Sequence, residues 1–326
     1  MFDCTISIIQ LVLMIVSLLQ NSGLTNSVAT STILIKESLG AQSVAAGCDG
    51  DFFIACGKPN NQSVLCRYID NKVNNSFEIN TKGVVRIFPL SNKKEIIVVT
   101  QEGKIFNVQI DKFEKCNILI SADVRVNDVA VSQDESRIAL ATEQGDILIY
   151  DLAGKKLLKK CKLKDSIPIS LCFSRNDMQL YSGHRNGAII IWNVADWSVH
   201  KKLLAHDEGV SFLLVADNRD FFISGSRDSL VKSWSAQYFT RISTWNLGNL
   251  EPVAAKYVTC SEHIAIGCMS GELVLLSTSL KATIAEIKLH AHTYPLTTVA
   301  YSSQLKTIIT GSIIEEQLIA WRKWPK

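Results

Sequence analysis

The stretch Asp228–Ala236, which reads DSLVKSWSA, decides the fold because the chain repeats its pattern. Similar stretches are GDILIYDL from Gly145, GAIIIWNV from Gly187 and GELVLLST from Gly271. Each is a turn residue followed by a short β-rich run that ends in a large side chain. These large residues recur about every 42 positions, in the series Tyr68, Val108, Tyr150, Trp192, Trp234, Leu276 and Trp321. A fixed period of this length indicates repeated structural units.

Each unit contains the same succession of elements, as the unit around Trp192 shows. The apolar run Ile169–Phe173 comes first, a polar turn follows, and a second run ends in a small residue, Gly183. The tight turn Asn186-Gly187 then leads into the strand that carries Trp192, and a more polar fourth strand ends the unit. Four short antiparallel strands per unit form a propeller blade, which buries its faces only by stacking on its neighbours. The sequence therefore predicts an all-β fold, a single seven-bladed β-propeller of four-stranded antiparallel blades.

The last unit lacks a fourth strand, because only residues 322–326 follow Trp321. The β-rich run Thr32–Lys36 has no partner in its own unit. We expect this N-terminal strand to complete the last blade and to close the ring, since an unpaired edge is a liability. The predicted propeller spans residues 31–326, after an apolar leader over residues 1–30.

The segment Ser224–Trp234, SGSRDSLVKSW, with His206 before it, resembles the WD40-repeat family. The resemblance covers residues 43–321, although the Trp-Asp dipeptide itself is absent. It implies that His206, Ser224, Asp228 and Trp234 form a buried structural hydrogen-bond network. It also implies that a partner binds the face made by the turns before the first strand and between the second and third strands of each blade. The matching positions are Arg125, His184, Arg185, Asp207, Arg227 and Tyr294.

No motif in the chain predicts catalysis, a metal site or a cofactor. His206, Ser224 and Asp228 have the residue types of a hydrolase triad, but Ser224 lies inside a predicted strand and no G-x-S-x-G motif occurs. His290 and His292 offer two ligands without a third nearby, so we expect a structural role for them. Phosphate-binding and dinucleotide-binding glycine motifs are also absent from the sequence. We expect no catalytic residue, no metal and no cofactor.

Charge and composition favour a folded protein with a mixed surface. Apolar residues make up 47% of the chain, and 34 Lys and Arg balance 31 Asp and Glu, which leaves a net charge of +3. The strongest charge cluster falls on the predicted outer strand of the third blade and comprises Lys155, Lys156, Lys159, Lys160, Lys162 and Lys164. Lysines on an exposed edge block pairing with other strands. The alternative is that they contact phosphate groups or an acidic partner.

The compartment is open at this stage. Nine cysteines without any Cys-x-x-Cys pair favour buried thiols in a reducing, cytoplasmic environment. Against this, the apolar run Ile6–Leu19 and the small residues Ser27 and Ala29 are compatible with a signal peptide over residues 1–29. In that case the sequons at Asn61 and Asn74 would matter. No stable membrane span is expected, because no apolar run reaches the required length.

The sequence thus predicts a non-catalytic scaffold that binds a peptide or protein partner on one face of a monomeric propeller, within a multiprotein complex. One alternative is an RNA-associated subunit of a modifying or processing complex that uses Lys155, Lys156, Lys159 and Lys160. A further alternative is an enzyme with a propeller pocket. The identity of the partner lies in a few loop side chains, which the fold does not determine.

Overall fold

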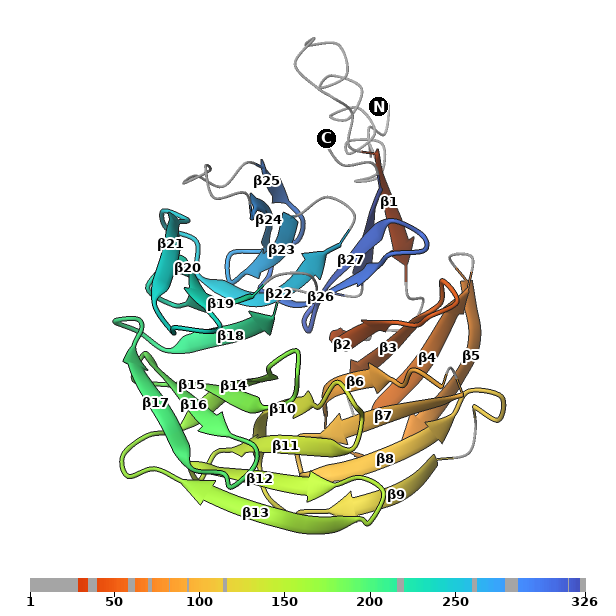
Figure 1. Ribbon diagram of the computed structural model, residues 1–326. Helices are drawn as coiled ribbons and strands as arrows, with labels where there is room; N and C mark the ends of the chain where they lie inside the picture. The colour runs from red at the N-terminus through yellow and green to blue at the C-terminus, as the bar shows by residue number, and fades with distance from the viewer. Residues whose placement is uncertain are drawn as a thin grey trace, which may run out of the picture.

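A computed structural model of the chain describes residues 29–34, 40–57, 62–69, 72–81, 83–92, 94–113, 116–215, 220–259, 263–278, 287–315 and 317–322. Within these ranges all regular structure is β-strand. The 28 strands form seven four-stranded antiparallel sheets arranged around a common centre, as Figure 1 shows. The prediction of a seven-bladed β-propeller is confirmed.

The blades follow one another along the chain. The first three consist of β2 (Ala41–Ala46), β3 (Phe52–Gly57), β4 (Ser63–Ile69) and β5 (Lys72–Ile79); β6 (Val84–Pro89), β7 (Glu95–Thr100), β8 (Lys104–Gln109) and β9 (Cys116–Ser121); and β10 (Val126–Val131), β11 (Arg137–Thr142), β12 (Asp146–Asp151) and β13 (Lys156–Lys162). The next three consist of β14 (Pro168–Phe173), β15 (Gln179–His184), β16 (Ala188–Asn193) and β17 (Val199–Leu204); β18 (Val210–Val215), β19 (Phe221–Ser226), β20 (Leu230–Ser235) and β21 (Arg241–Asn246); and β22 (Pro252–Val258), β23 (His263–Cys268), β24 (Glu272–Ser277) and β25 (Ile287–His290).

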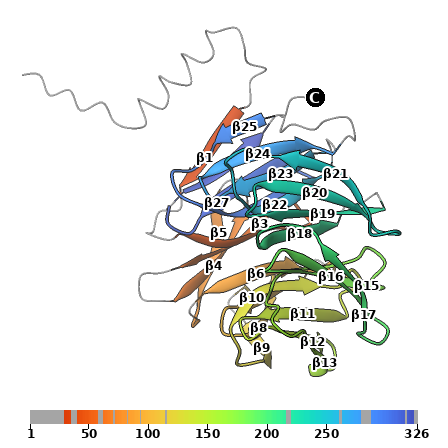
Figure 2. The same cartoon turned by 90° about the vertical axis from the view of Figure 1, so that its left-hand side faces the viewer.

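The seventh blade combines both ends of the described chain. It contains β26 (Leu296–Ser302), β27 (Thr307–Ser312) and β28 (Gln317–Arg322), and β1 (Ala29–Leu34) pairs with β28 as the fourth strand. The register runs from Ala29 opposite Arg322 to Leu34 opposite Gln317. Figures 1 and 2 both show β1 beside this blade. The closing strand is therefore confirmed, and it lies at 29–34, slightly before the predicted run 32–36.

The middle strands of each blade are buried on both faces, because neighbouring blades cover them. The buried side chains of β15, β19 and β20 meet between the fourth and fifth blades, where the rings of Tyr181 and Phe222 stack with centroids 4.4 Å apart. Trp234 continues the stack on Phe222. The apolar runs that defined the period in the sequence thus form one core layer between each pair of blades.

The first strands of the seven blades contact one another around the ring. Each first strand carries a β-bulge at its second residue, so that this residue is left out of the pairing with the second strand. Polar side chains of these strands also link the blades, since the carboxylate of Asp128 contacts Arg86 at 2.6 Å and accepts a hydrogen bond from the backbone N–H of Leu171 at 2.8 Å. One side chain thereby joins the second, third and fourth blades.

The turns between the second and third strands use the left-handed backbone region that the sequence predicted. Gly145, Gly187 and Gly271 have φ values of +86°, +78° and +90°, and Ser229 occupies the same position in the fifth blade with φ +63°. At Gly187 and Gly271 there is also no room for a side chain, because a Cβ atom would lie 2.0 Å from the carbonyl oxygen of His206 or His292. These turns are packed directly under the loops that precede the next blade.

Candidate functional site: the top face of the propeller

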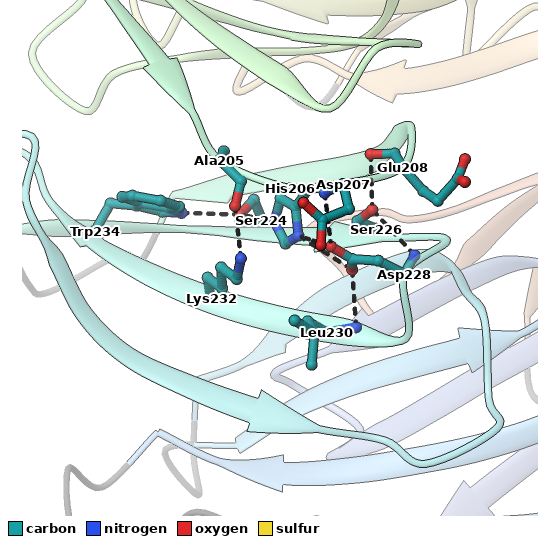
Figure 3. Close-up of polar contacts among 10 residues, drawn as sticks. All are labelled: Ala205, His206, Asp207, Glu208, Ser224, Ser226, Asp228, Leu230, Lys232 and Trp234. Carbon is teal, nitrogen blue, oxygen red and sulfur yellow. Dashed lines mark hydrogen bonds and ion pairs between the residues drawn. The ribbon is translucent and has the colours of Figure 1, made fainter.

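The residues that the sequence analysis grouped as a network lie together in the fifth blade (Figure 3). The indole N–H of Trp234 donates to Ser224 Oγ at 2.8 Å, and Ser224 Oγ lies 2.8 Å from His206 Nε2. His206 Nδ1 lies 2.9 Å from Asp228 Oδ2. Asp228 also accepts hydrogen bonds from the backbone N–H groups of Asp207 and Leu230. The network therefore ties the loop before β18 to the turn between β19 and β20.

The protonation states of this network follow from its donors and acceptors. Burial lowers the pKa of His206 more than Asp228 raises it, so the ring is neutral near pH 7. Burial would raise the pKa of Asp228, but His206 and two backbone N–H groups outweigh it and hold the pKa below its ordinary value. The carboxylate can only accept, so Nδ1 of His206 carries the proton and Ser224 donates to Nε2. Ser224 is fully buried in a strand, which gives it no access to a substrate.

Related networks occur in the seventh and fourth blades. In the seventh, Trp321 donates to Thr310, which contacts His292, and Glu315 lies 2.5 Å from Nδ1 of that ring. In the fourth, Trp192 donates to Ser182, and the hydroxyl of Ser182 contacts Nε2 of His184 at the end of β15. Nδ1 of His184 contacts the hydroxyl of Ser166. In this blade the imidazole is on the last residue of the second strand. The equivalent position in the fifth blade is occupied by Ser226.

The expectation that His184 contacts a partner is therefore wrong. Its side chain is 1% exposed, and both ring nitrogens are used within the fourth blade. Burial lowers the pKa of His184 to about 4, and Lys202 adds to this effect. His184 is a neutral core residue at pH 7 and cannot reach the surface.

The remaining predicted contact residues lie on one end of the propeller, here called the top face. It is formed by the loops before the first strand of each blade and by the turns between the second and third strands, which antiparallel order places at the same end. Arg125, Arg185, Asp207 and Arg227 are exposed, and Tyr294 is 47% exposed. Arg125 forms an ion pair with Glu143 at 3.6 Å.

A cavity of about 330 Å³ opens on this face, and residues of the third, fourth, fifth and sixth blades line it. Its lining includes the bulged residues of four first strands, Asn127, Ile169, Ser211 and Val253. Its charged lining comprises Arg185, Arg227, Glu208 and Glu251. The resemblance predicted the two arginines as contact residues, whereas both glutamates were missed because their loops vary between blades.

Exposed apolar side chains lie on the top face at the sixth and seventh blades, and one of them, Met269, lines the cavity. This apolar rim, as it is called below, consists of Met269, Tyr294, Ile313 and Ile314, which are 41–56% exposed. The three loops that carry it are packed together, since Glu315 accepts hydrogen bonds from the N–H groups of Thr293 and Tyr294, and the carbonyl of Gly271 accepts one from the N–H of His292. The repeat could have identified Met269 and Ile313, because they occupy the same turn position as Arg185 and Arg227.

The lysine cluster lies on β13, the outermost strand of the third blade, and on the residues beside it, Lys155 and Lys164. Its lysine side chains are exposed. Two of them are engaged within the blade, since Lys160 and Lys162 lie 2.8 Å and 3.6 Å from the carboxylate of Asp146 on β12. The free part of this edge therefore comprises Lys155, Lys156, Lys159 and Lys164.

The described residues offer neither a metal cluster nor a membrane-spanning helix. Within them, no group of three or more His, Cys, Asp or Glu side chains is placed to hold a metal ion. The same part of the chain contains no helix with the length and apolarity needed to cross a bilayer. The leader, Asn61, Cys4 and Cys260 lie outside it.

Comparison with known proteins identifies the repeat. The family model described as the NUP159/214 beta propeller matches residues 68–230, which is half of the chain and extends from β4 to β20. LEC14B protein of Lithospermum erythrorhizon is 27% identical over 114 residues, which cover 33% of this chain and 24% of that protein. The 77 kDa echinoderm microtubule-associated protein of Lytechinus variegatus is 31% identical over 111 residues, covering 32% and 16%.

WD repeat-containing protein 90 of Homo sapiens is 22% identical over 185 residues, which cover 55% of this chain and 11% of that protein. The matched segments thus span no more than 24% of the length of any of these three relatives. The blade architecture, the Trp-Ser-His-Asp network and the match over residues 68–230 agree with one another. The chain belongs to the NUP159/214 β-propeller family, and with it to the WD-repeat β-propellers.

Proposed function

We propose that the chain is a non-catalytic scaffold that holds a peptide or protein partner on its top face, as a monomeric propeller within a multiprotein complex. The observation that carries this proposal is the top-face cavity, where Arg185 and Arg227 form no ion pair within the described part of the chain. Arginine and tyrosine side chains are typical anchors of protein interfaces. Buried networks elsewhere keep the blades rigid, so the face is presented as a preformed surface.

The test is differential capture of partners by the tagged full-length chain. The top-face variant combines Arg185→Ala, Arg227→Ala and Tyr294→Ala, and the control variant combines Lys156→Ala and Lys159→Ala on the outer edge of the third blade. Quantitative mass spectrometry should show a partner that the unmodified chain and the edge variant capture and that the top-face variant loses. Equal capture by all three would contradict the proposal.

The outer edge supports a second candidate, an RNA-associated subunit. Lys155, Lys156, Lys159 and Lys164 are exposed on or beside one strand and could contact phosphates. Binding of a labelled single-stranded RNA should then weaken steeply with added salt and should be lost in a variant that combines Lys155→Ala, Lys156→Ala, Lys159→Ala and Lys164→Ala. Retention of RNA binding in that variant would exclude this use of the edge.

We also propose a cytoplasmic location. Cys56, Cys161 and Cys268 are buried, and none of the described cysteines forms a disulfide, which suits a reducing compartment. Sequencing of the N-terminus of the protein isolated from its cells is the test. A mature chain that begins near Thr30 would indicate entry into the secretory pathway.

A further inference from the structure

The turns between the second and third strands place one equivalent residue from each of six blades on the top face. These residues directly follow the second strand and are Gln101, Glu143, Arg185, Arg227, Met269 and Ile313. In five blades the backbone N–H of this residue donates to the carbonyl of the residue before the first strand, at 2.8–3.1 Å. The backbone therefore holds these residues at equivalent places around the ring, and Arg185, Arg227 and Met269 are the ones that line the cavity.

The chemistry of this position changes in order around the ring. In the third blade Glu143 faces Arg125 and is neutralised by it. In the fourth and fifth blades the backbone partners are Ile167 and Gly209, so the residue that pairs with the backbone of each arginine carries no acidic group. In the sixth and seventh blades the position is apolar, and it continues into the apolar rim. Two guanidinium groups are thus followed directly by exposed apolar side chains.

The carboxylates of the cavity limit what the two arginines can attract. Glu208 and Glu251 line the same cavity, and neither forms an ion pair within the described residues. Their charge would repel a polyanion such as RNA, whereas a single carboxylate can still accept paired hydrogen bonds from a guanidinium group. The apolar rim requires a large apolar group on the same ligand. These features together fit one short segment of polypeptide.

We infer that the top face recognises a short peptide in one orientation, with an acidic side chain at Arg185 and Arg227 and a large apolar side chain on the apolar rim. This inference rests on the proposed function and specifies its ligand. The orientation of the peptide follows from the order of the blades. The basic positions lie in the fourth and fifth blades, and the apolar positions lie in the sixth and seventh blades beside them. A peptide that carries both groups in the reverse order would place only one of them.

The experiment begins with selection from a random library of short displayed peptides on the immobilised full-length chain. We expect the enriched peptides to share an Asp or Glu at a fixed distance from a Leu, Ile, Met or aromatic residue. An enriched peptide is then synthesised with a fluorescent label, together with its acid-to-amide version and its reversed sequence. Fluorescence polarisation measures the affinity of the chain for each probe.

Two protein variants separate the two contacts. Arg185→Gln with Arg227→Gln should weaken binding of the parent peptide about tenfold or more, and should change binding of the amide version far less. Met269→Ser with Ile313→Ser should weaken both versions alike. The matched control is Gln101→Ala, which alters the equivalent turn position away from the cavity and should leave every affinity unchanged.

Each outcome decides between the inference and the broader proposal. Enriched peptides without an acidic residue, or equal affinity for the reversed sequence, would overturn the inference. If the enriched peptides nevertheless lost their binding to either top-face variant, that result would still support the proposed function. Enriched peptides that bind all variants equally would contradict both. Recovery of no peptide above background would overturn the peptide inference, and partner capture would then decide the proposed function alone.

Discussion

A single hydroxyl group holds the centre of each polar network between loop and strand. Ser224, Ser182 and Thr310 each accept a hydrogen bond from a tryptophan N–H and contact a histidine nitrogen. Each hydroxyl is buried, so no water replaces a lost partner. These residues contribute to stability mainly through the hydrogen bonds that they form with buried polar groups, and less through the packing of their own small side chains.

Ser224→Ala should therefore lower the free energy of unfolding by about 1–3 kcal/mol, because it leaves the Trp234 N–H and His206 Nε2 without partners. Denaturant titration followed by tryptophan fluorescence measures the change. Ser121→Ala is the control, since Ser121 is exposed and bonds only to Asp123, and its effect should stay within about 0.5 kcal/mol. Equal losses in the two variants would show that the network contributes nothing.

His184 makes stability depend on pH between its ordinary pKa of 6.5 and its folded pKa of about 4. In this window the unfolded chain binds a proton at His184 that the folded chain does not, so stability falls as the pH falls. The loss attributable to His184 is at most about 3 kcal/mol and is complete below about pH 4. His206 titrates with the same sign, and Asp134, with a pKa of about 2, contributes only at lower pH.

His184→Asn should accordingly be less stable at neutral pH and should lose less stability on acidification than the unmodified chain. Unfolding free energies measured from pH 7 down to the folded pKa compare the two slopes. Identical slopes would show that the pKa of His184 is the same in the folded and the unfolded chain.

The residues of the fifth-blade network were predictable, whereas those of the fourth were not. His206 precedes β18 at the place where the repeat expects a histidine, and Asp228 follows two residues after β19. In the fourth blade the same imidazole is supplied from the strand end by His184, which a repeat alignment assigns to the surface turn. Sequence spacing locates a position in the fold, but it does not say which neighbouring residue fills a buried space.

At the scale of elements, the seven first strands carry the links between blades. Asp128 on β10 contacts Arg86 on β6 and the backbone of β14. Ser170 on β14 donates to the carbonyl of Val210 on β18, and Thr298 on β26 accepts from the N–H of Val44 on β2. These residues occupy the third position of their strands, just after the bulge. The bulge turns this position toward the next blade.

Asp128→Ala should lower the free energy of unfolding by about 1–3 kcal/mol, because it leaves the N–H of Leu171 and the guanidinium of Arg86 without this partner. Burial raises the pKa of Asp128 in spite of Arg86, which shows that the carboxylate is held in a poorly solvated place. A double-mutant cycle with Arg86→Ala measures their coupling. Additive effects of the two changes would contradict a direct link.

Strand order within each blade followed from the sequence, because the periodic large residues fix the third strand. Val108 and Leu276 fill this position without an aromatic ring, and both are fully buried in it. The bulges of the first strands could not be predicted, since the residues at their second positions range from Gln42 to Val253 and share no local signal. For this reason the part of the cavity lining that these bulged residues form could not be predicted from the pattern, although its arginines could.

At the scale of the whole molecule, closure depends on a strand that is remote in sequence. β1 and β28 are the outer and next strands of one blade, and the backbone of β1 pairs with residues 317–322. Without β1, the edge of β28 would be exposed, and the contact between the first and seventh blades would join a blade of three strands. The ring is therefore closed by backbone pairing as well as by the packing of β2 on β26.

Replacement of residues 29–34 by a Gly-Ser segment of equal length should lower the melting temperature of the whole propeller, because it weakens the pairing that closes the ring. Scanning calorimetry is the measurement. A replacement of the same length built from alternating Val and Thr should retain most of the stability, since backbone pairing needs strand propensity more than a given sequence. An unchanged melting temperature with the Gly-Ser segment would contradict a closing role.

The closing strand also sets a waiting time during protein synthesis. β1 ends at Leu34 and its partner β28 begins at Gln317, so β1 leaves the ribosome long before β28 has been made. At about 5–20 residues per second, that interval is roughly 15–60 s. Throughout it, the six complete blades can form in succession, but β1 has no strand to pair with and is open to chaperones, proteases and other nascent chains. Nascent chains halted before Gln317 should therefore remain protease-sensitive at β1, however well the other blades have folded.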